Sequence, residues 1–175
     1  ELITIAQQAG PISSSAGPKT LADYGFDDAP DLDLILIPGG IGTIAELKND
    51  ALLNFLRQRC PQSRVTMSVC TGSALLAKAG LLDGLAATSN KMFFELARSQ
   101  GDKVDWQESA RWVDAGQYVT SSGVSAGTDM ALAVIERVFD AELAEQVINY
   151  TEYQWHRQAD ADPFAQLLNQ GVTPS

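Results

Sequence analysis

Cys70 is the residue of this sequence best placed to do covalent chemistry, because it stands where a strand-like run meets a helix-like one, in VTMSVCTGSALLAKAGLL at residues 65–82. In an open α/β sheet, a residue in such a turn projects toward the crevice where ligands bind. A helix starting at Gly72 would direct free N–H groups and its positive dipole end at the sulfur, which favours the thiolate. Two interpretations are open: a nucleophile, or a small residue that fills a strand-to-helix junction.

A glycine turn follows an earlier apolar run, in LILIPGGIGTIAEL at residues 34–47. Without side chains at Gly39 and Gly40, backbone N–H groups can approach a ligand closely. Such a turn can supply one half of an oxyanion hole, and the amide of Thr71 beside the nucleophile can supply the other. Gly-Gly after a strand also fits an ordinary tight turn, so the oxyanion hypothesis depends on Cys70.

A second nucleophile motif competes with this cysteine. Gly123, Ser125 and Gly127 match the GxSxG pattern of hydrolase elbows. Asp140 and His156 follow them in the serine, aspartate, histidine order of α/β hydrolases. The alternative is that the serine caps a helix, and that the histidine is a half-buried packing residue near a helix end.

Strand-like and helix-like segments alternate along the chain, which predicts an α/β fold with a mostly parallel sheet covered by helices on both faces. The expected strands are residues 2–6, 33–37, 64–69, 86–89 and 118–122. The expected helices are residues 50–59, 72–79, 92–99, 129–139 and 141–155. Residues 10–31 are rich in proline and glycine and are expected to be irregular. From about residue 160 to residue 175 we expect a C-terminal tail that ends in disorder.

Composition indicates one domain over residues 1–175, long enough to bury its own core. Two cysteines and one histidine are too few for a disulfide scaffold or a Cys/His zinc site. Cys60, in RQRCPQS, lacks an activating neighbourhood and is interpreted as structural.

A formal net charge of -10 disfavours nucleic acid and anionic membranes as partners. No apolar run approaches the roughly 20 residues of a spanning helix. A cytoplasmic protein is expected.

The motifs around Cys70 resemble those of the DJ-1/PfpI superfamily, which is related to class I glutamine amidotransferase domains. The resemblance covers nearly the whole chain and rests on three stretches: PGG at residues 38–40, CTGSALLAKAGLLDGLAATS at 70–89 and SSGVSAGTDMALAVIE at 121–136. It implies a flavodoxin-like three-layer sandwich and a homodimer, with no cofactor and no metal. It also implies Cys70 as nucleophile and an oxyanion site near Gly40 and Thr71, which makes the GxSxG match a coincidence.

Two departures from the family pattern limit what the resemblance implies. Many members carry a histidine after the strand that follows the elbow helix, whereas this chain has Asn90, in ATSNK. Asparagine can orient a substrate but cannot act as a base near neutral pH, so protease or amidotransferase chemistry is not expected. Members also carry an acidic residue after their first strand. This sequence corresponds to the family from its second strand onward, so we expect an N-terminally incomplete domain without its first strand and helix.

Within the superfamily, a CTGS elbow without a histidine partner is most similar to the isocyanide hydratase branch. That resemblance implies a small-molecule substrate: the Cys70 thiolate attacks the terminal carbon of an isonitrile, and water converts the resulting thioimidate to an N-substituted formamide. Thr71 would orient a water or an acid, and the expected substrate-binding residues are Gly39, Gly40, Thr71 and Asn90. The alternative is a catalytically silent ligand-binding or redox-sensing domain in which Cys70 is oxidised. A GxSxG serine hydrolase is the third hypothesis.

Overall fold

The computed structural model describes residues 1–14 and 17–170, and a four-stranded sheet in the order β3-β4-β8-β7 forms its centre. The strands are β3 (Leu34–Ile37), β4 (Val65–Val69), β7 (Trp112–Ala115) and β8 (Tyr118–Ser121). β3, β4 and β8 are parallel, and β7 is antiparallel to β8. The carboxyl ends of the three parallel strands therefore lie at one edge of the sheet, where α/β proteins place their ligand sites.

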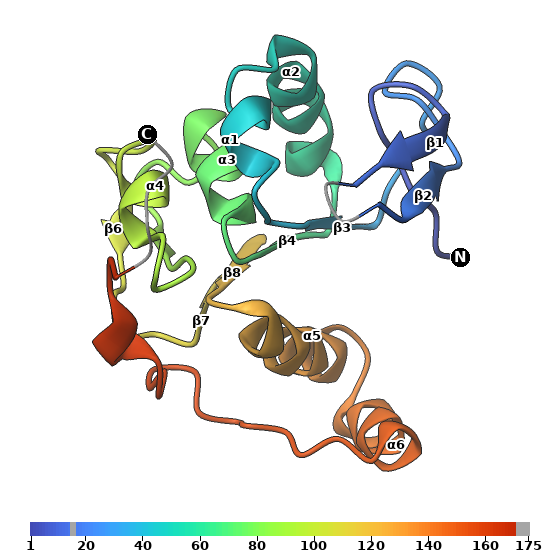
Figure 1. Ribbon diagram of the computed structural model, residues 1–175. Coiled ribbons are helices and arrows are strands. Elements are labelled where there is room, and N and C mark those ends of the chain that lie inside the picture. The colour runs from blue at the N-terminus through green and yellow to red at the C-terminus, as the bar shows by residue number, and fades with distance from the viewer. Residues whose placement is uncertain (15–16, 171–175) are drawn as a thin grey trace.

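Helices cover both faces of this sheet (Figure 1). On one side lie α1 (Thr43–Glu46), α2 (Asp50–Arg59) and α3 (Gly72–Lys78); on the other lie α5 (Val124–Val138) and α6 (Ala141–Thr151). Asn49 caps α2 and Asp140 caps α6, because each side chain accepts a hydrogen bond from the backbone N–H three residues later. The fold is the expected flavodoxin-like α/β sandwich. No helix among the described residues is long and apolar enough to cross a bilayer.

Each face of the sheet has its own core. Between the sheet and α2 and α3 the most deeply buried aliphatic side chains include Leu53, Leu56, Leu75, Leu76 and Leu82. Between the sheet and α5 the buried side chains are Val65, Trp112, Val119, Met130 and Val134. Cys60 lies in the first core with 0% of its surface exposed, and this burial raises its pKa to about 11. It is a buried, protonated thiol, as its interpretation as a structural residue predicts.

The remaining elements flank the sheet. β5 (Ala86–Ala87) pairs in parallel with β6 (Asp105–Trp106), and α4 (Phe94–Arg98) lies between them in the chain. β1 (Gly10–Ser13) and β2 (Lys19–Ala22) form a separate antiparallel pair. Short 3-10 turns occur at Cys60–Gln62 and Ala165–Leu167.

Two expectations about the N-terminal region are wrong. Residues 10–31, expected to be irregular, contain β1 and β2. Gly10 and Pro11 are the first two residues of β1, and Gly17 and Pro18 directly precede β2. Residues 2–6, expected to be a strand, make only an isolated parallel bridge from Ile5 to Tyr24. They have no continuous partner strand among the described residues.

Helix and strand boundaries also differ from expectation. α5 begins at Val124 and not at residue 129, because Gly127 continues the helix instead of ending a turn. α6 ends at Thr151 and not at residue 155, because Glu152 adopts a left-handed conformation with φ 50°. The sequence pattern gave no indication of α1, β6 or β7, each of which is four residues or shorter.

The expected C-terminal tail packs on the protein as far as residue 170. The backbone N–H of Asp162 donates to Ser109 O at 2.7 Å, and the N–H of Asn169 donates to Lys91 O at 2.8 Å. Residues 171–175, where we expect disorder, lie outside the described residues.

Candidate active site at the Cys70 elbow

Cys70 occupies the turn between β4 and α3, and its backbone lies in the left-handed region with φ 59°. A residue with a Cβ is strained there, by roughly 1–3 kcal/mol, and persists only where its surroundings hold it. The Cys70 N–H donates to Ser122 O at 2.8 Å. Its carbonyl accepts from Ser89 Oγ at 3.2 Å and from Ser73 Oγ at 3.3 Å. Serines from three separate segments thus fix the main chain of Cys70, whose free thiol is half-buried, in a strand-to-helix elbow.

The elbow and the preceding glycine turn touch backbone to backbone. A Cβ added to Gly39 would lie 2.5 Å from the Thr71 nitrogen, and one added to Gly72 would lie 2.5 Å from Ile37 O. Neither distance is possible for real atoms, so each position requires glycine for close approach. Two turns that are about 30 residues apart in sequence therefore form one rigid unit at the carboxyl ends of β3 and β4.

The Thr71 hydroxyl connects these two turns. Its Oγ1 accepts a hydrogen bond from the Gly40 N–H at 3.0 Å and lies 2.9 Å from Thr43 Oγ1. Thr71 is buried, with 4% of its surface exposed. The Gly40 amide, expected to face an oxyanion, is thus directed at Thr71, and a ligand would have to replace the hydroxyl as its acceptor. The oxyanion role of Gly40 and the water-orienting role of Thr71 stay predictions.

Asn90 lies in the segment between β5 and α4. Its Oδ1 accepts from the Phe93 N–H at 3.2 Å, just before α4. With Ser122 and Gly123 it lines a cavity of about 210 Å³. That volume is below the range of roughly 300–1,000 Å³ typical of drug-sized ligands, so it suits a small molecule. Cys70 is not among the residues that line this cavity.

A buried network of charged side chains adjoins the same cavity. Arg111 Nε donates to Asp129 Oδ2 at 2.7 Å, and its Nη1 lies 3.5 Å from Asp162 Oδ1. Lys91 Nζ lies 3.9 Å from Asp162 Oδ2 and donates to Ala110 O at 2.6 Å. Burial lowers the pKa of Lys91 to about 8, although the charges of Asp162 and Glu108 oppose this shift. Sequence patterns missed this network because its members come from four distant segments.

Ser125 does not have the geometry of a nucleophile elbow. It lies in the first turn of α5, whereas the left-handed backbone of an elbow occurs at Cys70. Ser125 Oγ accepts a hydrogen bond from Arg111 Nη2 at 3.4 Å. A Cβ added to Gly127 would lie 2.7 Å from Val69 Cγ1, so this glycine lets α5 pack against β4. The second glycine of GxSxG therefore has a packing role.

The other two members of the possible serine triad are engaged elsewhere. Asp140 caps α6 by accepting from the Leu143 N–H at 2.7 Å. His156 is exposed, which contradicts the expected half-buried position, because α6 ends before it. Its backbone N–H donates to Asp129 Oδ1 at 2.9 Å. Within residues 1–14 and 17–170, no hydrogen bond joins Ser125 to either residue.

The site is thus a strained cysteine elbow, locked to a glycine turn at the carboxyl edge of a mainly parallel sheet. No group of three or more His, Cys, Asp or Glu side chains that could hold a metal ion occurs in the part of the chain that the structure describes. These features define a class of α/β proteins with a cysteine at the strand-to-helix elbow of a flavodoxin-like fold.

Comparison with known proteins identifies the family. The model of the DJ-1/PfpI family matches residues 1–137, and the chain belongs to this family. It is 34% identical over 154 residues to isonitrile hydratase of Pseudomonas putida, covering 88% of this chain and 64% of that protein. It is 29% identical over 151 residues to the HTH-type transcriptional regulator GbdR of Pseudomonas aeruginosa, covering 86% of this chain and 41% of the regulator.

A solved structure gives the same result. The chain superposes on a ThiJ/PfpI family protein from Pseudomonas syringae with a TM-score of 0.77 at 30% identity, covering 93% of this chain and 64% of that chain. The chain therefore spans less than two thirds of the length of these relatives.

Proposed function

We propose that this protein is a cysteine-dependent enzyme that hydrates isonitriles to N-substituted formamides, with Cys70 as the nucleophile. The observation that carries the proposal is the strained elbow at Cys70, which three serines hold in a conformation that a purely structural cysteine would not need. The similarity to isonitrile hydratase of Pseudomonas putida supports this choice of reaction.

The proposed reaction has two steps. The Cys70 thiolate adds to the terminal carbon of R–N≡C, forming a C–S bond while that carbon takes up a proton, to give the thioimidate R–N=CH–S–Cys70. Water then adds to the same carbon, the C–S bond breaks, and R–NH–CHO leaves as the thiol is regenerated. No amine departs, so the residue at position 90 need not act as a base. Asn90 orients the substrate in this proposal, and the backbone amides of Gly39, Gly40 and Thr71 stabilise developing charge.

An isonitrile assay tests this proposal directly. Formation of N-cyclohexylformamide from cyclohexyl isocyanide is followed for the protein from its complete reading frame and for its Cys70→Ser variant. The expected result is turnover that the substitution abolishes, while the urea unfolding midpoint shows that the variant is folded. Cys60→Ala serves as the control, since Cys60 lies in the core and its loss should affect stability but not turnover per folded molecule. Turnover by Cys70→Ser would refute the thiolate mechanism.

A redox-sensing or ligand-binding domain is the second candidate, favoured by the similarity to the regulator GbdR. In that case Cys70 is oxidised to a sulfenic or sulfinic acid and does not turn over. Mass spectrometry after mild peroxide treatment separates the two candidates. Stoichiometric oxidation of Cys70, without turnover of any isonitrile, would favour the sensor.

The proposed assembly and location follow from the family and the thiols. We propose a homodimer, which light scattering of the purified protein tests, and a cytoplasmic location, because both cysteines are free thiols.

A serine hydrolase is the least supported candidate, since Arg111 donates a hydrogen bond to Ser125 Oγ. A fluorophosphonate probe that labelled Ser125 would revive it.

A further inference from the structure

Asp162 lies in residues 153–169, which we call the C-terminal strap. Figure 1 shows the strap running from the end of α6 back to the side of β7. Asp162 Oδ1 lies 3.5 Å from Arg111 Nη1. The backbone of Arg111 continues this connection, because its C=O accepts from the Ser122 N–H at 2.9 Å, and Ser122 O accepts from the Cys70 N–H at 2.8 Å. The strap is thus joined to one of the bonds that fix the elbow.

A second connection starts at the other oxygen of the same carboxylate. Asp162 Oδ2 lies 3.9 Å from Lys91 Nζ, and this Nζ donates to Thr88 Oγ1 at 2.9 Å. Thr88 and Lys91 stand on either side of Ser89 in the chain, and Ser89 Oγ donates to Cys70 O at 3.2 Å. One carboxylate is therefore connected to both of the distant segments that hold the elbow.

The charged groups in these two connections are almost fully buried. The exposed fraction is 1% for the side chain of Asp162, 2% for that of Lys91 and 6% for that of Arg111. Without the carboxylate, Arg111 would keep its ion pair with Asp129, whereas Lys91 would keep no ion pair within the described part of the chain. A buried cation without a partner is costly. Loss of the carboxylate should therefore displace Lys91 and the segment around Ser89.

These segments are held together mainly by polar contacts, because a cavity lies among them. Asn90, Ser122 and Asp162, one from each segment, all line this cavity of about 210 Å³. Side chains do not fill the space, so apolar packing cannot fix the three segments against one another there. We therefore expect the hydrogen bonds and ion pairs at the border of the cavity to set their relative positions.

We propose that Asp162 is a positioning residue for Cys70. Its carboxylate holds the two segments whose serines fix the elbow, so it sets the conformation of the Cys70 backbone as well as the stability of the strap. This role rests on the proposed function, in which Cys70 is the nucleophile, since a reactive group keeps its productive geometry only where surrounding contacts hold it. A purely structural ion pair would stabilise the strap and leave the elbow unchanged.

Hydrogen exchange of the Cys70 amide tests this role, because that N–H donates to Ser122 O. The protein is expressed from its complete reading frame, with and without Asp162→Asn. Loss of global stability also speeds exchange, so the comparison is with a control variant at the same free energy of unfolding. We expect the Cys70 amide to exchange at least about 10-fold faster in Asp162→Asn than in this control. Equal rates would overturn the proposal.

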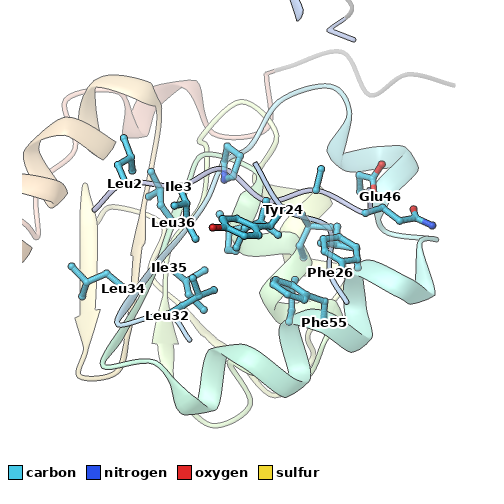
Figure 2. Close-up of a pocket in the computed structure, with 18 of the residues that line it drawn as sticks. Leu2, Ile3, Tyr24, Phe26, Leu32, Leu34, Ile35, Leu36, Glu46 and Phe55 are labelled. Atoms are coloured by element: carbon cyan, nitrogen blue, oxygen red, sulfur yellow. The ribbon is translucent and has the colours of Figure 1, made fainter. Parts of the chain in front are cut away.

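Phe55→Leu is the matched control. Figure 2 shows Phe55 beside Phe26 at a cavity along β3, and the two rings stack with their centroids 4.5 Å apart. This contact belongs to the core between the sheet and α2, so its loss lowers stability without changing the strap. The urea concentration is adjusted until both variants have the same free energy of unfolding.

Carbon chemical shifts of Cys70 provide a second readout. The ¹³Cα and ¹³Cβ shifts depend on φ and ψ, so they report the left-handed backbone, with φ 59°, directly. We expect Asp162→Asn to move both shifts toward those of a right-handed residue. Asp160→Asn, at an exposed position of the strap, should leave them unchanged. A lower urea midpoint with unchanged Cys70 shifts would show a purely structural carboxylate and overturn the proposal.

Lys91→Met decides the question even where Asp162→Asn does not fold. It removes the connection through Lys91 and leaves Arg111 paired with Asp162 and Asp129. We expect the Cys70 amide to exchange at least about 3-fold faster than in the matched control. Exchange no faster than in the control would overturn the proposal.

Turnover separates this role from the proposed function. Where the parent protein hydrates cyclohexyl isocyanide, we expect Asp162→Asn to lower kcat at least about 10-fold and Asp160→Asn to leave it unchanged. An unchanged kcat in Asp162→Asn would overturn the positioning role. A parent protein without turnover would refute the proposed reaction, and the exchange and chemical-shift measurements would then decide whether Asp162 holds the elbow.

Discussion

The two thiols of this protein have the same chemistry but opposite surroundings. Cys60 is completely buried in the core, and burial raises its pKa to about 11. Cys70 is half-buried at the elbow, where its main chain is fixed by serines. We therefore expect the two thiols to differ in accessibility to reagents because of their positions in the fold.

Thiol labelling should distinguish Cys60 from Cys70. With an aromatic disulfide reagent at pH 8, we expect the native protein to react through Cys70 and the urea-unfolded protein to react at both cysteines. Cys60 is 0% exposed and holds its proton until the pH approaches 11. Rapid labelling of Cys60 in the native protein would contradict the buried position described here.

Lys91 should make stability depend on alkaline pH. Its pKa falls from 10.5 in the unfolded chain to about 8 in the folded protein because of burial. Between these values the unfolded chain holds more protons than the folded one, so the free energy of unfolding rises with pH, by about 3 kcal/mol in total. The slope is measured by urea unfolding at a series of pH values and should disappear in Lys91→Met.

Cys60 has the opposite effect and must be removed for this measurement. Its pKa rises from 9.0 to about 11 on folding, so it lowers the free energy of unfolding as the pH rises between those values. The comparison is therefore made between Cys60→Ala and the double variant with Lys91→Met. Equal slopes in both proteins would show that Lys91 keeps an ordinary pKa.

At the scale of elements, the site depends on how closely two turns can approach. Gly39 and Gly72 let the end of β3 and the start of α3 meet without side chains between them. Gly40, in contrast, needs its glycine for a positive φ of 134° and has no atom within 4 Å of an added Cβ. These glycines are required for two different physical reasons.

Alanine substitution should separate the two reasons. Gly39→Ala places a Cβ 2.5 Å from a backbone nitrogen, which cannot move without shifting the elbow. We expect a loss of about 3 kcal/mol in the free energy of unfolding, as for overpacking in a rigid core. Gly40→Ala adds only backbone strain, about 1–2 kcal/mol. Urea unfolding of both variants measures which substitution lowers the free energy of unfolding more. A smaller loss for Gly39→Ala than for Gly40→Ala would refute the close-contact argument.

The sequence predicted the elements that carry a strong local signal. α2 was expected with its observed bounds, because Asn49 is a good cap and the helix is amphipathic. The elbow at Cys70 was visible from the strand-to-helix pattern. β7 was missed because a four-residue strand shows little alternation, and β1 and β2 were missed because glycine and proline favour loops.

Contacts between distant segments could not be predicted in the same way. Ser89 and Ser122 bond to the Cys70 backbone from segments 19 and 52 residues further along the chain. Nothing in a small polar residue after a short strand indicates which backbone group it will meet. The contact between the hydroxyls of Thr71 and Thr43 could not be predicted for the same reason, since Thr43 lies in an unexpected helix.

At the scale of the whole molecule, residues 153–169 tie the C-terminal end to the carboxyl edge of the sheet. Tyr153 Oη donates to Asp129 Oδ1 at 3.2 Å, and Arg111 N–H donates to Ala159 O at 2.7 Å. Asp162 then stands between Lys91 and Arg111. Asp162 is thus a buried counter-charge for Lys91, and it shares Arg111 with a second buried carboxylate, that of Asp129.

Removing this carboxylate should loosen the whole C-terminal segment. Asp162→Ala leaves Lys91 without a buried counter-charge, and we expect a loss of about 3 kcal/mol in the free energy of unfolding. Asp160→Ala, two residues away and exposed, is the matched control and should change it by less than about 0.5 kcal/mol. Similar urea midpoints for the two variants would mean that the buried pair of Lys91 and Asp162 contributes little to the free energy of unfolding.

The left-handed backbone at position 70 makes cysteine less stable there than glycine would be. Glycine is the one residue that adopts a φ of 59° without strain, so Cys70→Gly should be more stable than Cys70→Ala by about 1 kcal/mol. Urea unfolding of the two variants measures the difference, and equal stability would show a relaxed elbow. A design procedure that rewarded stability alone would therefore replace the cysteine, and with it the nucleophile proposed for this edge of the sheet.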